Sequence, residues 1–321
     1  MNLPTDKHPL IVIVGPTAVG KTSASIELAK RFMGEVVSAD SRLLYRGMDI
    51  GTAKPTLAER CGIPHHLMDV ADPDENWSLA LYQSEAYRVI DDVLSRNKLP
   101  FLVGGTGQYI RSIIEGWQIP PQKPDYDLRD ALNHWADKIG AEALYERLKA
   151  IDADAAVNMD YRNVRRVVRA LEVIFKTGER FSDLRRKQQC PYQPVILGIE
   201  RPREELYERI DQRIEIMLTQ GWLDEVKFLL AKGYPPDMPT FSAIGYGEVI
   251  QFLQDKLTFE EAMRAIKRNT RAFVRRQANW FKPDDPRITW FSADDDLVNQ
   301  MESEIRRRIN ECFKETLAKS L

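Results

Sequence analysis

Residues 15–22 have the composition of a phosphate site. They read Gly-Pro-Thr-Ala-Val-Gly-Lys-Thr, which has the glycine and lysine spacing of a phosphate-binding loop, between an apolar run and a helical pattern. The glycines allow successive backbone N–H groups to turn toward an anion, Lys21 offers a charge to terminal phosphates, and the Thr22 hydroxyl can ligate Mg²⁺. We therefore expect a phosphorylated small molecule to bind at Gly15, Pro16, Thr17, Ala18, Val19, Gly20, Lys21 and Thr22.

Two basic sets of residues could bind a polyanion. Seven basic side chains and no acid lie within residues 264–282, namely Arg264, Lys267, Arg268, Arg271, Arg275, Arg276 and Lys282. Arg162, Arg165, Arg166 and Arg169 recur at a spacing of three and four residues, which predicts one helix face. For this second set the alternative is a solvated face paired with acids. Binding of RNA phosphates would release counterions and depend on salt. A protein that holds both ligands would be a transferase acting on nucleic acid.

Two polar residues follow predicted strands. Short apolar runs that read as strands lie at residues 10–14, 35–39 and 100–103. In a doubly wound sheet, ligands bind beyond the carboxyl ends of the strands, so we expect Asp40 and Thr106 near the phosphate site. Asp40 could anchor Mg²⁺ or act as a general base toward a second substrate. The structural alternative for Asp40 is a helix N-cap after the strand.

The order of elements predicts an α/β fold with a mostly parallel sheet. A proline-rich joint at 119–124 interrupts it, residues 126–184 are almost all helical, and the sheet resumes with the apolar run 195–199 after a second joint. We therefore expect a core formed by residues 1–116 and 191–321, with a helical insertion domain at 117–190. Further helices are expected at 22–32, 79–94, 205–232, 245–254 and 259–281, and a last strand at 288–291.

The composition is that of a globular protein. Of 321 residues 43% are hydrophobic and 29% charged, and the net charge of −2 means that acids elsewhere balance the basic sets. No apolar run approaches the length of a membrane span, and the first residues lack a signal-peptide pattern. Three separated cysteines and the adjacent His65 and His66 offer no metal-ligand set. We therefore expect a cytoplasmic protein with no zinc site and no membrane partner.

Several strings of residues resemble one family. They are 15–22, 38–41 (Ser-Ala-Asp-Ser), 45–55 (Tyr-Arg-Gly-Met-Asp-Ile-Gly-Thr-Ala-Lys-Pro), 104–107 (Gly-Gly-Thr-Gly), 169–172 (Arg-Ala-Leu-Glu), 209–213 (Arg-Ile-Asp-Gln-Arg) and 244–246 (Ile-Gly-Tyr). In this order, from about residue 10 to 292, they resemble the bacterial tRNA dimethylallyltransferases, or isopentenyltransferases. The resemblance implies a P-loop NTPase-like core with a helical insertion, acting as a monomer.

The resemblance also implies a reaction. Members of this family use Mg²⁺ to move a dimethylallyl group from dimethylallyl diphosphate to N6 of the adenosine 3′ of the anticodon (position 37), in tRNAs reading codons that begin with U. By likeness, Asp40 is the base for the adenine amine, Thr106 lies at the reaction centre, and Arg213 acts with the phosphate loop on the departing diphosphate.

The anticodon stem-loop of tRNA is the implied partner. Because the reacting base must be turned out of a stacked loop, the enzyme needs a pocket and a clamp on the flanking RNA, and the insertion would supply the clamp. The residues that the resemblance assigns to tRNA contact are Asp40, Ser41, Arg42, Leu43, Thr106, Arg129, Arg165, Arg166, Arg169, Ile244, Gly245, Tyr246, Arg275, Arg276 and Lys282. Trp280 and Phe281 are expected in the core, since large aromatic side chains are mostly buried.

Two other functions fit the same residues. In a small-molecule or nucleoside kinase, Asp40 would anchor Mg²⁺ and the loop would hold ATP. In a non-catalytic RNA-binding protein, the loop would merely hold phosphate, and Asp40 would be dispensable. Consumption of ATP distinguishes the kinase from a prenyltransferase, which needs none.

Overall fold

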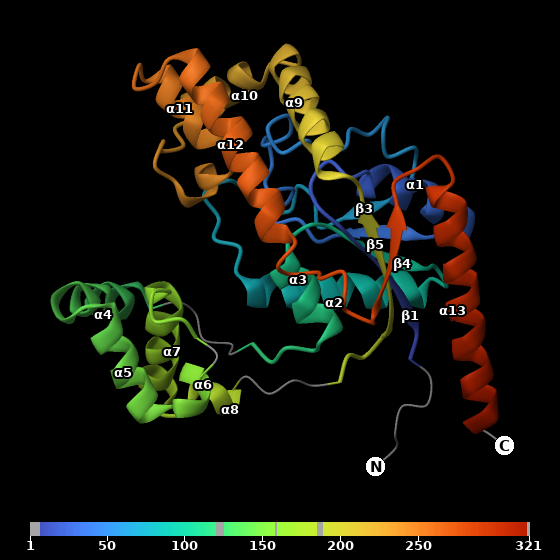
Figure 1. The fold of residues 1–321 in the computed structure, drawn as a ribbon, viewed down its shortest axis with the longest axis horizontal. Coiled ribbons are helices and arrows are strands. Elements are labelled where there is room, and N and C mark those ends of the chain that lie inside the picture. The colour runs from blue at the N-terminus through green and yellow to red at the C-terminus, as the bar shows by residue number, and fades with distance from the viewer. Residues whose placement is uncertain (1–6, 120–124, 158, 185–188, 320–321) are drawn as a thin grey trace. The chain divides into compact units, whose positions relative to one another are not determined.

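The chain forms two compact units. The computed structural model describes residues 7–119, 125–157, 159–184 and 189–319, so most of the proline-rich joint expected at 119–124 lies outside the described residues. One unit, here the core unit, comprises Met1–Ile114 and Pro191–Leu321, and the other, the inserted unit, is Glu115–Cys190 (Figure 1). No helix in the described ranges is both long and apolar enough to cross a membrane.

The core unit contains a six-stranded sheet in the order β3-β2-β4-β1-β5-β6, and every strand pairing is parallel. Its strands are β1 (Pro9–Val14), β2 (Glu35–Ser38), β3 (His65–His66), β4 (Pro100–Val103), β5 (Gln193–Glu200) and β6 (Ile288–Ser292). The predicted α/β class is confirmed. Strand β3 was not predicted, because two residues are too few to show an alternating pattern.

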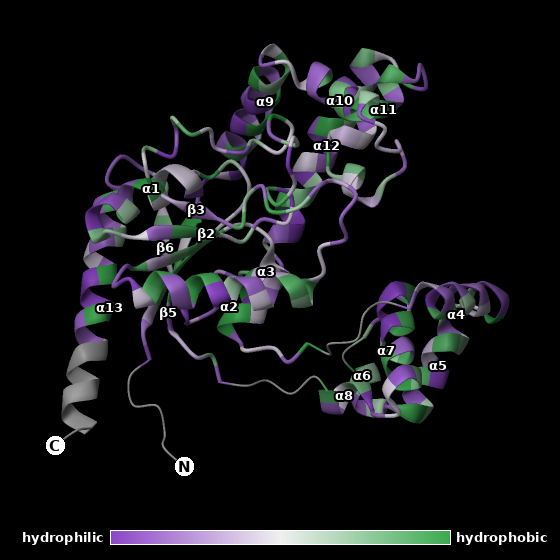
Figure 2. Cartoon of the chain, turned by 180° about the vertical axis from the view of Figure 1, so that it is seen from behind, coloured by the Kyte–Doolittle hydropathy of each residue, from purple (hydrophilic) through white to green (hydrophobic). Residues whose placement is uncertain are grey.

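Alternate residues of the strands face two helical layers. Ile11 and Ile13 of β1 pack in one hydrophobic cluster with α1 (Lys21–Phe32) and α13 (Leu297–Lys319). The other strand face meets α2 (Leu79–Ser95), which packs on β2, β4 and α3 (Gly107–Ile114). Figure 2 shows the strands as mainly hydrophobic, whereas α13 carries hydrophilic colour along much of its length. The strands therefore read as continuous apolar runs, as is typical of parallel strands covered on both faces.

Four more helices of the core unit gather near the carboxyl ends of the strands (Figure 1). They are α9 (Arg203–Thr219), α10 (Trp222–Ala231), α11 (Tyr246–Leu253) and α12 (Phe259–Gln277). The single helix expected at 205–232 is wrong, because Gly221 adopts a left-handed φ of 95° and separates α9 from α10. Helices α3 and α13 were not predicted.

The inserted unit is helical. Its helices are α4 (Tyr126–Ile139), α5 (Ala141–Ile151), α6 (Ala153–Val157), α7 (Val164–Thr177) and α8 (Phe181–Leu184). Asn163 caps α7 by accepting a hydrogen bond from Arg166 N, so the helix begins after Arg162. The expectation that Arg162 shares a helix face with Arg165 and Arg169 is therefore wrong, and Arg162 instead pairs with Asp160.

A buried carboxylate organises the inserted unit. Glu172 of α7 has a side chain with no exposed area, and it accepts hydrogen bonds from Asp125 N, Arg129 Nε and Arg169 Nη1, each at 2.8 Å. The two arginines come from α4 and α7, so a single carboxylate connects these helices. The arginine side chains remain 30% and 28% exposed, which leaves part of each guanidinium at the surface.

We expect Glu172→Ala to lower the free energy of unfolding of the inserted unit by about 3 kcal/mol, because it leaves two arginines beside a buried space without their carboxylate. The control is Glu146→Ala in the same unit, where an exposed pair with Lys149 is lost and the change should stay below about 0.5 kcal/mol. Urea unfolding followed by circular dichroism measures both values. Equal effects of the two substitutions would contradict the organising role of Glu172.

Candidate active site

Three adjacent strands end at one edge of the sheet and bring the predicted site residues together. β2, β4 and β1 are neighbours, and they lead into Asp40, the turn at 104–107 and the loop at 15–20 respectively. The Thr106 hydroxyl accepts a hydrogen bond from Ser41 N at 3.0 Å, and Thr106 N donates to Ala39 O at 3.1 Å. Thr106 is thus bonded directly to the segment that carries Asp40.

The loop at 15–20 has the geometry of an anion cradle. Gly15 has a φ of 148°, and a Cβ there would lie 2.5 Å from Ile199 O, so a larger residue would collide with the backbone of β5. Gly20 has a left-handed φ of 111° and immediately precedes α1. The N-terminus of α1 therefore points its free N–H groups and partial positive charge into the loop. Lys21 Nζ donates to Gly15 O at 3.0 Å and to Pro16 O at 2.7 Å.

Two cations and one carboxylate share this site. Burial lowers the pKa of Lys21 to about 8, an effect that Asp40 opposes and Arg213 reinforces. Burial likewise lowers the pKa of Arg213 below its ordinary value, and again Asp40 opposes the shift. Both cations therefore lie within electrostatic reach of the Asp40 carboxylate. The excess positive charge in a partly dry site suits an anionic ligand.

Asp40 is not a helix cap. Its Oδ1 accepts a hydrogen bond from Arg42 N at 2.9 Å, which makes a local turn, and no helix begins in the described residues that follow β2 until α2. The alternative of an N-cap at this position is therefore wrong. Arg42 in turn reaches toward residues 240–242, where its Nη1 donates to Thr240 O at 3.3 Å.

The segment 45–55, which carries the most distinctive string of the sequence, is held by a buried lysine. The Lys54 side chain is 3% exposed, and its Nζ donates to Tyr45 O at 2.7 Å and to the carboxylates of Asp49 and Asp69. A buried ammonium needs such partners, since an unpaired charge would be costly. Lys54 therefore closes this segment into a compact loop.

Glu225 of α10 holds the same segment from outside. Its carboxylate accepts hydrogen bonds from the backbone N–H groups of Asp49, Ile50 and Gly51, at 2.9, 2.6 and 3.1 Å. The segment in turn supports the site, because Arg213 Nη2 donates to Ala53 O at 3.3 Å. The segment 45–55 thus helps to position Arg213, one of the two cations of the site. Sequence reasoning missed Glu225, since a lone glutamate on a helix gives no signal of a distant backbone partner.

One residue assigned to tRNA contact has no exposed side chain. Tyr246 is fully buried, its ring stacks on Phe241, and its hydroxyl donates to Glu225 at 2.6 Å. A direct contact of the Tyr246 side chain with RNA does not fit this arrangement. Of its neighbours, Ile244 is half-buried and Gly245 is buried.

The basic residues of α12 are accessible. Arg275 and Arg276 are exposed, as is Lys282 beyond the helix. A surface cavity of about 300 Å³ is lined by Arg264, Lys267, Arg268, Arg271 and Arg275. Asp211 of α9 pairs with Lys267 at 3.6 Å and with Arg271 at 2.7 Å, and Glu215 also pairs with Lys267, at 3.5 Å. Five cations thus face two acids, and most of the positive charge remains. Phe281 is buried, as expected, whereas Trp280 is only half-buried and is therefore not fully in the core.

The remaining residues assigned to tRNA contact lie in the turn that follows Asp40 and on α7. Ser41 and Leu43 are half-buried in the turn after Asp40. On α7, Arg165 is exposed and Arg166 is half-buried.

One hydroxyl beside the phosphate loop, that of Thr22, could bind a metal ion. Among the described residues no group of three His, Cys, Asp or Glu side chains is placed to hold a metal. Thr22, however, is exposed at the first turn of α1, next to the loop. Mg²⁺ characteristically keeps several waters and binds through few protein oxygens together with substrate phosphates. Thr22 fits that mode of binding.

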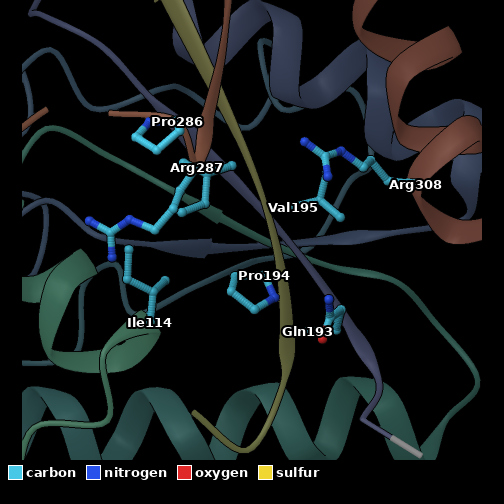
Figure 3. A pocket seen from close by; sticks show the side chains of 8 residues that line it. Ile114, Gln193, Pro194, Val195, Pro286, Arg287 and Arg308 are labelled. Atoms are coloured by element: carbon cyan, nitrogen blue, oxygen red, sulfur yellow. The ribbon is translucent and has the colours of Figure 1, made fainter. Parts of the chain in front are cut away.

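A further cavity lies at the other end of the strands, where β5 begins. It has a volume of about 350 Å³ and is lined by Ile114, Gln193, Pro194, Val195, Ile196, Pro286, Arg287 and Arg308 (Figure 3). Its β5 residues are the first ones of the strand, whereas the phosphate loop follows the end of β1. Arg287 pairs with Asp285, and Arg308 shares Glu304 with Arg307, so the charge of both cations is partly offset by nearby acids. The candidate site is therefore not this cavity.

An all-parallel sheet with a glycine-rich loop between β1 and α1 defines a P-loop protein of the α/β class. Residues 43–284 match the family model described as IPP transferase, and residues 8–68 match that described as isopentenyl transferase. The tRNA dimethylallyltransferase of Roseiflexus sp. (strain RS-1) is 50% identical over 303 residues, which cover 94% of this chain and 99% of that relative. The chain belongs to the tRNA dimethylallyltransferase family.

Solved structures are similar as well. The crystal structure of a tRNA isopentenylpyrophosphate transferase from Bacillus halodurans has a TM-score of 0.71 and 40% identity, covering 98% of this chain and 99% of that one. A eukaryotic dimethylallyltransferase acting on tRNA has a TM-score of 0.77 and 29% identity, covering 94% of this chain and 77% of that one. The predicted fold and family, and with them the prediction of a prenyltransferase, are confirmed.

The lowered pKa of Lys21 predicts how anion binding depends on pH. The ammonium is charged below pH 8 and loses its proton as the pH rises through about 8. Affinity for inorganic pyrophosphate should therefore fall above that pH, by up to about tenfold per unit. Because pyrophosphate also titrates, the control is Lys21→Arg, which stays charged and should show a flatter profile. Identical profiles, measured by calorimetry, would contradict the role of Lys21.

Proposed function

We propose that this chain transfers a dimethylallyl group from dimethylallyl diphosphate to N6 of the adenosine 3′ of the anticodon, at position 37 of tRNAs that read codons beginning with U. The observation that carries the proposal is the position of Asp40, which shares one edge of the sheet with the phosphate loop and lies within electrostatic reach of both Lys21 and Arg213. The proposal includes action as a monomer in the cytoplasm, as the resemblance implies.

The site residues divide the reaction between them. The N6 amine attacks the allylic carbon, the bond from that carbon to the diphosphate oxygen breaks, and its electron pair leaves with the diphosphate. Lys21, Arg213 and the amides of the loop stabilise the charge that develops there. Asp40 takes the proton that N6 loses, which helps because the amine lone pair is delocalised into the adenine ring. Thr106, bonded to Ser41, orients the segment that carries the base.

Mg²⁺ is the proposed cofactor. The Thr22 hydroxyl would hold it, beside oxygens of the bound diphosphate. When bound, the ion would add positive charge at the leaving group. The loop that usually holds a nucleoside triphosphate would thus hold a prenyl diphosphate.

The basic residues provide the proposed tRNA surface. In the core unit, Arg275, Arg276 and Lys282 are exposed, and none of them pairs with an acidic side chain of the residues that the structure describes. In the inserted unit, Arg165 is exposed, while Arg129 and Arg169 keep part of their guanidinium groups at the surface beside Glu172. We propose that these groups contact RNA phosphates and that the inserted unit clamps the anticodon stem.

The direct test is to incubate the protein with labelled dimethylallyl diphosphate, Mg²⁺ and tRNAs that have adenosine after the anticodon, and to measure the label in the tRNA. We expect label in the tRNA without any need for ATP. If no tRNA were labelled and ATP were hydrolysed instead, the protein would be the kinase described above.

Asp40→Asn should lower kcat by about 10²–10⁴-fold, because the amide cannot accept the proton from N6. Pyrophosphate affinity should not weaken, since the substitution removes a negative charge beside the cations. Single-turnover transfer and calorimetry measure the two effects separately. Asp237→Asn, at an exposed aspartate, is the control and should match the wild type. A kcat unchanged in Asp40→Asn would exclude Asp40 as the base.

Arg275→Ala and Arg276→Ala should weaken binding of all tRNAs alike. Each lost phosphate contact should also reduce the slope of log K against log salt by about 0.7–0.9, because fewer counterions are released. Arg88→Ala on α2, whose side chain is 67% exposed, is a control of equal charge. Filter binding at several salt concentrations measures the slopes. The same slope in all three variants would place the RNA elsewhere.

A further inference from the structure

Gln277, the last residue of α12, bonds to two loops of the candidate site. Its Oε1 accepts a hydrogen bond from Thr17 N in the phosphate loop at 2.9 Å, and its Nε2 donates to Gly105 O at 3.1 Å. The residue is 5% exposed. Gly105 directly precedes Thr106, so one buried side chain lies between the diphosphate loop and the turn that supports Asp40.

The surroundings of Gln277 leave it little freedom. A Cβ on Gly105 would lie 2.2 Å from Gln277 Nε2, so only glycine allows this close approach. Just beyond the helix, the Trp280 ring lies against Gly107, and Arg111 Nη2 donates to Trp280 O at 2.6 Å. The end of α12 is thereby docked onto the loops that follow β1 and β4.

The same end of α12 carries the exposed Arg275 and Arg276. These side chains face solvent, while Gln277, one residue on, faces the site. A single helix end therefore joins the proposed RNA surface to the phosphate loop.

We propose that Gln277 is a positioning residue that sets the separation of the phosphate loop and the Thr106 turn, and so aligns the diphosphate donor with Asp40. This inference rests on the proposed function. A neutral amide is suited to the task, because it accepts from an N–H and donates to a carbonyl at once, which neither a carboxylate nor an aliphatic side chain does. It also occupies Thr17 N, which leaves the later amides of the loop for the anion.

Gln277→Glu tests the donated hydrogen bond with little change of shape. An ionised carboxylate still accepts from Thr17 N but repels Gly105 O, whereas a protonated carboxyl accepts and donates as the amide does. The transfer activity of the variant relative to wild type should therefore rise several-fold as the pH falls from about 8 to about 6, since burial favours the neutral acid. Taking the ratio cancels the pH dependence that the variant and the wild type share. A flat ratio would overturn the proposal.

Gln277→Leu removes both hydrogen bonds. We expect kcat/KM for dimethylallyl diphosphate to fall by about 10–100-fold, a loss of the size seen when an outer partner that orients the groups of a site is removed. The Kd for tRNA should stay within about twofold of wild type, because Arg275 and Arg276 are retained. Gln251→Leu, at an exposed glutamine of α11, is the control and should leave all constants unchanged.

These experiments distinguish a failure of the proposed function from a failure of the role proposed for Gln277. If the wild type transfers no label to tRNA, the proposed function fails. If the wild type transfers label and Gln277→Leu matches it in kcat and in donor KM, the proposal for Gln277 fails. Weaker tRNA binding with an unchanged donor KM would make Gln277 a part of the RNA surface instead, and would equally overturn its positioning role.

Discussion

The phosphate loop, Asp40 and Thr106 depend on three neighbouring parallel strands that end at the same edge. Because β2, β4 and β1 run in one direction side by side, the residues that follow them must lie close together although 15, 40 and 106 are far apart in the chain. The strands are buried on both faces, so their register is held by packing on α1, α13 and α2. The site thus stands at the ends of strands that are buried in the core of the sheet.

Strand ends alone do not position a reaction, because loops carry the reacting groups. Each loop here is held by a polar side chain with several partners. Lys54 closes the segment 45–55 from within, Glu225 binds three of its N–H groups from α10, and Gln277 joins two other loops from α12. Such contacts hold a site to the precision that proximity effects demand.

The charge distribution explains how a chain with a net charge of −2 can offer surfaces to RNA. Acids are used as structural partners in places where cations need anchoring, such as Glu172 between Arg129 and Arg169. At the end of α12, by contrast, Arg275 and Arg276 are exposed without a carboxylate partner among the described residues. Local segregation of charge, and not net charge, therefore decides where a polyanion can bind.

Local patterns in the sequence were enough to predict five of the six strands, the phosphate loop and the helical insertion, because each depends on residues that are neighbours in the chain. The proximity of Asp40 and Thr106 to the loop could be predicted as well, because it follows from a general rule for parallel sheets. The break at Gly221, the burial of Tyr246, and the bonds made by Glu225 and Gln277 could not be predicted in this way. Those features arise when elements distant in the chain pack together, and hydrogen bonds between residues 172 positions apart leave no periodic trace in the sequence.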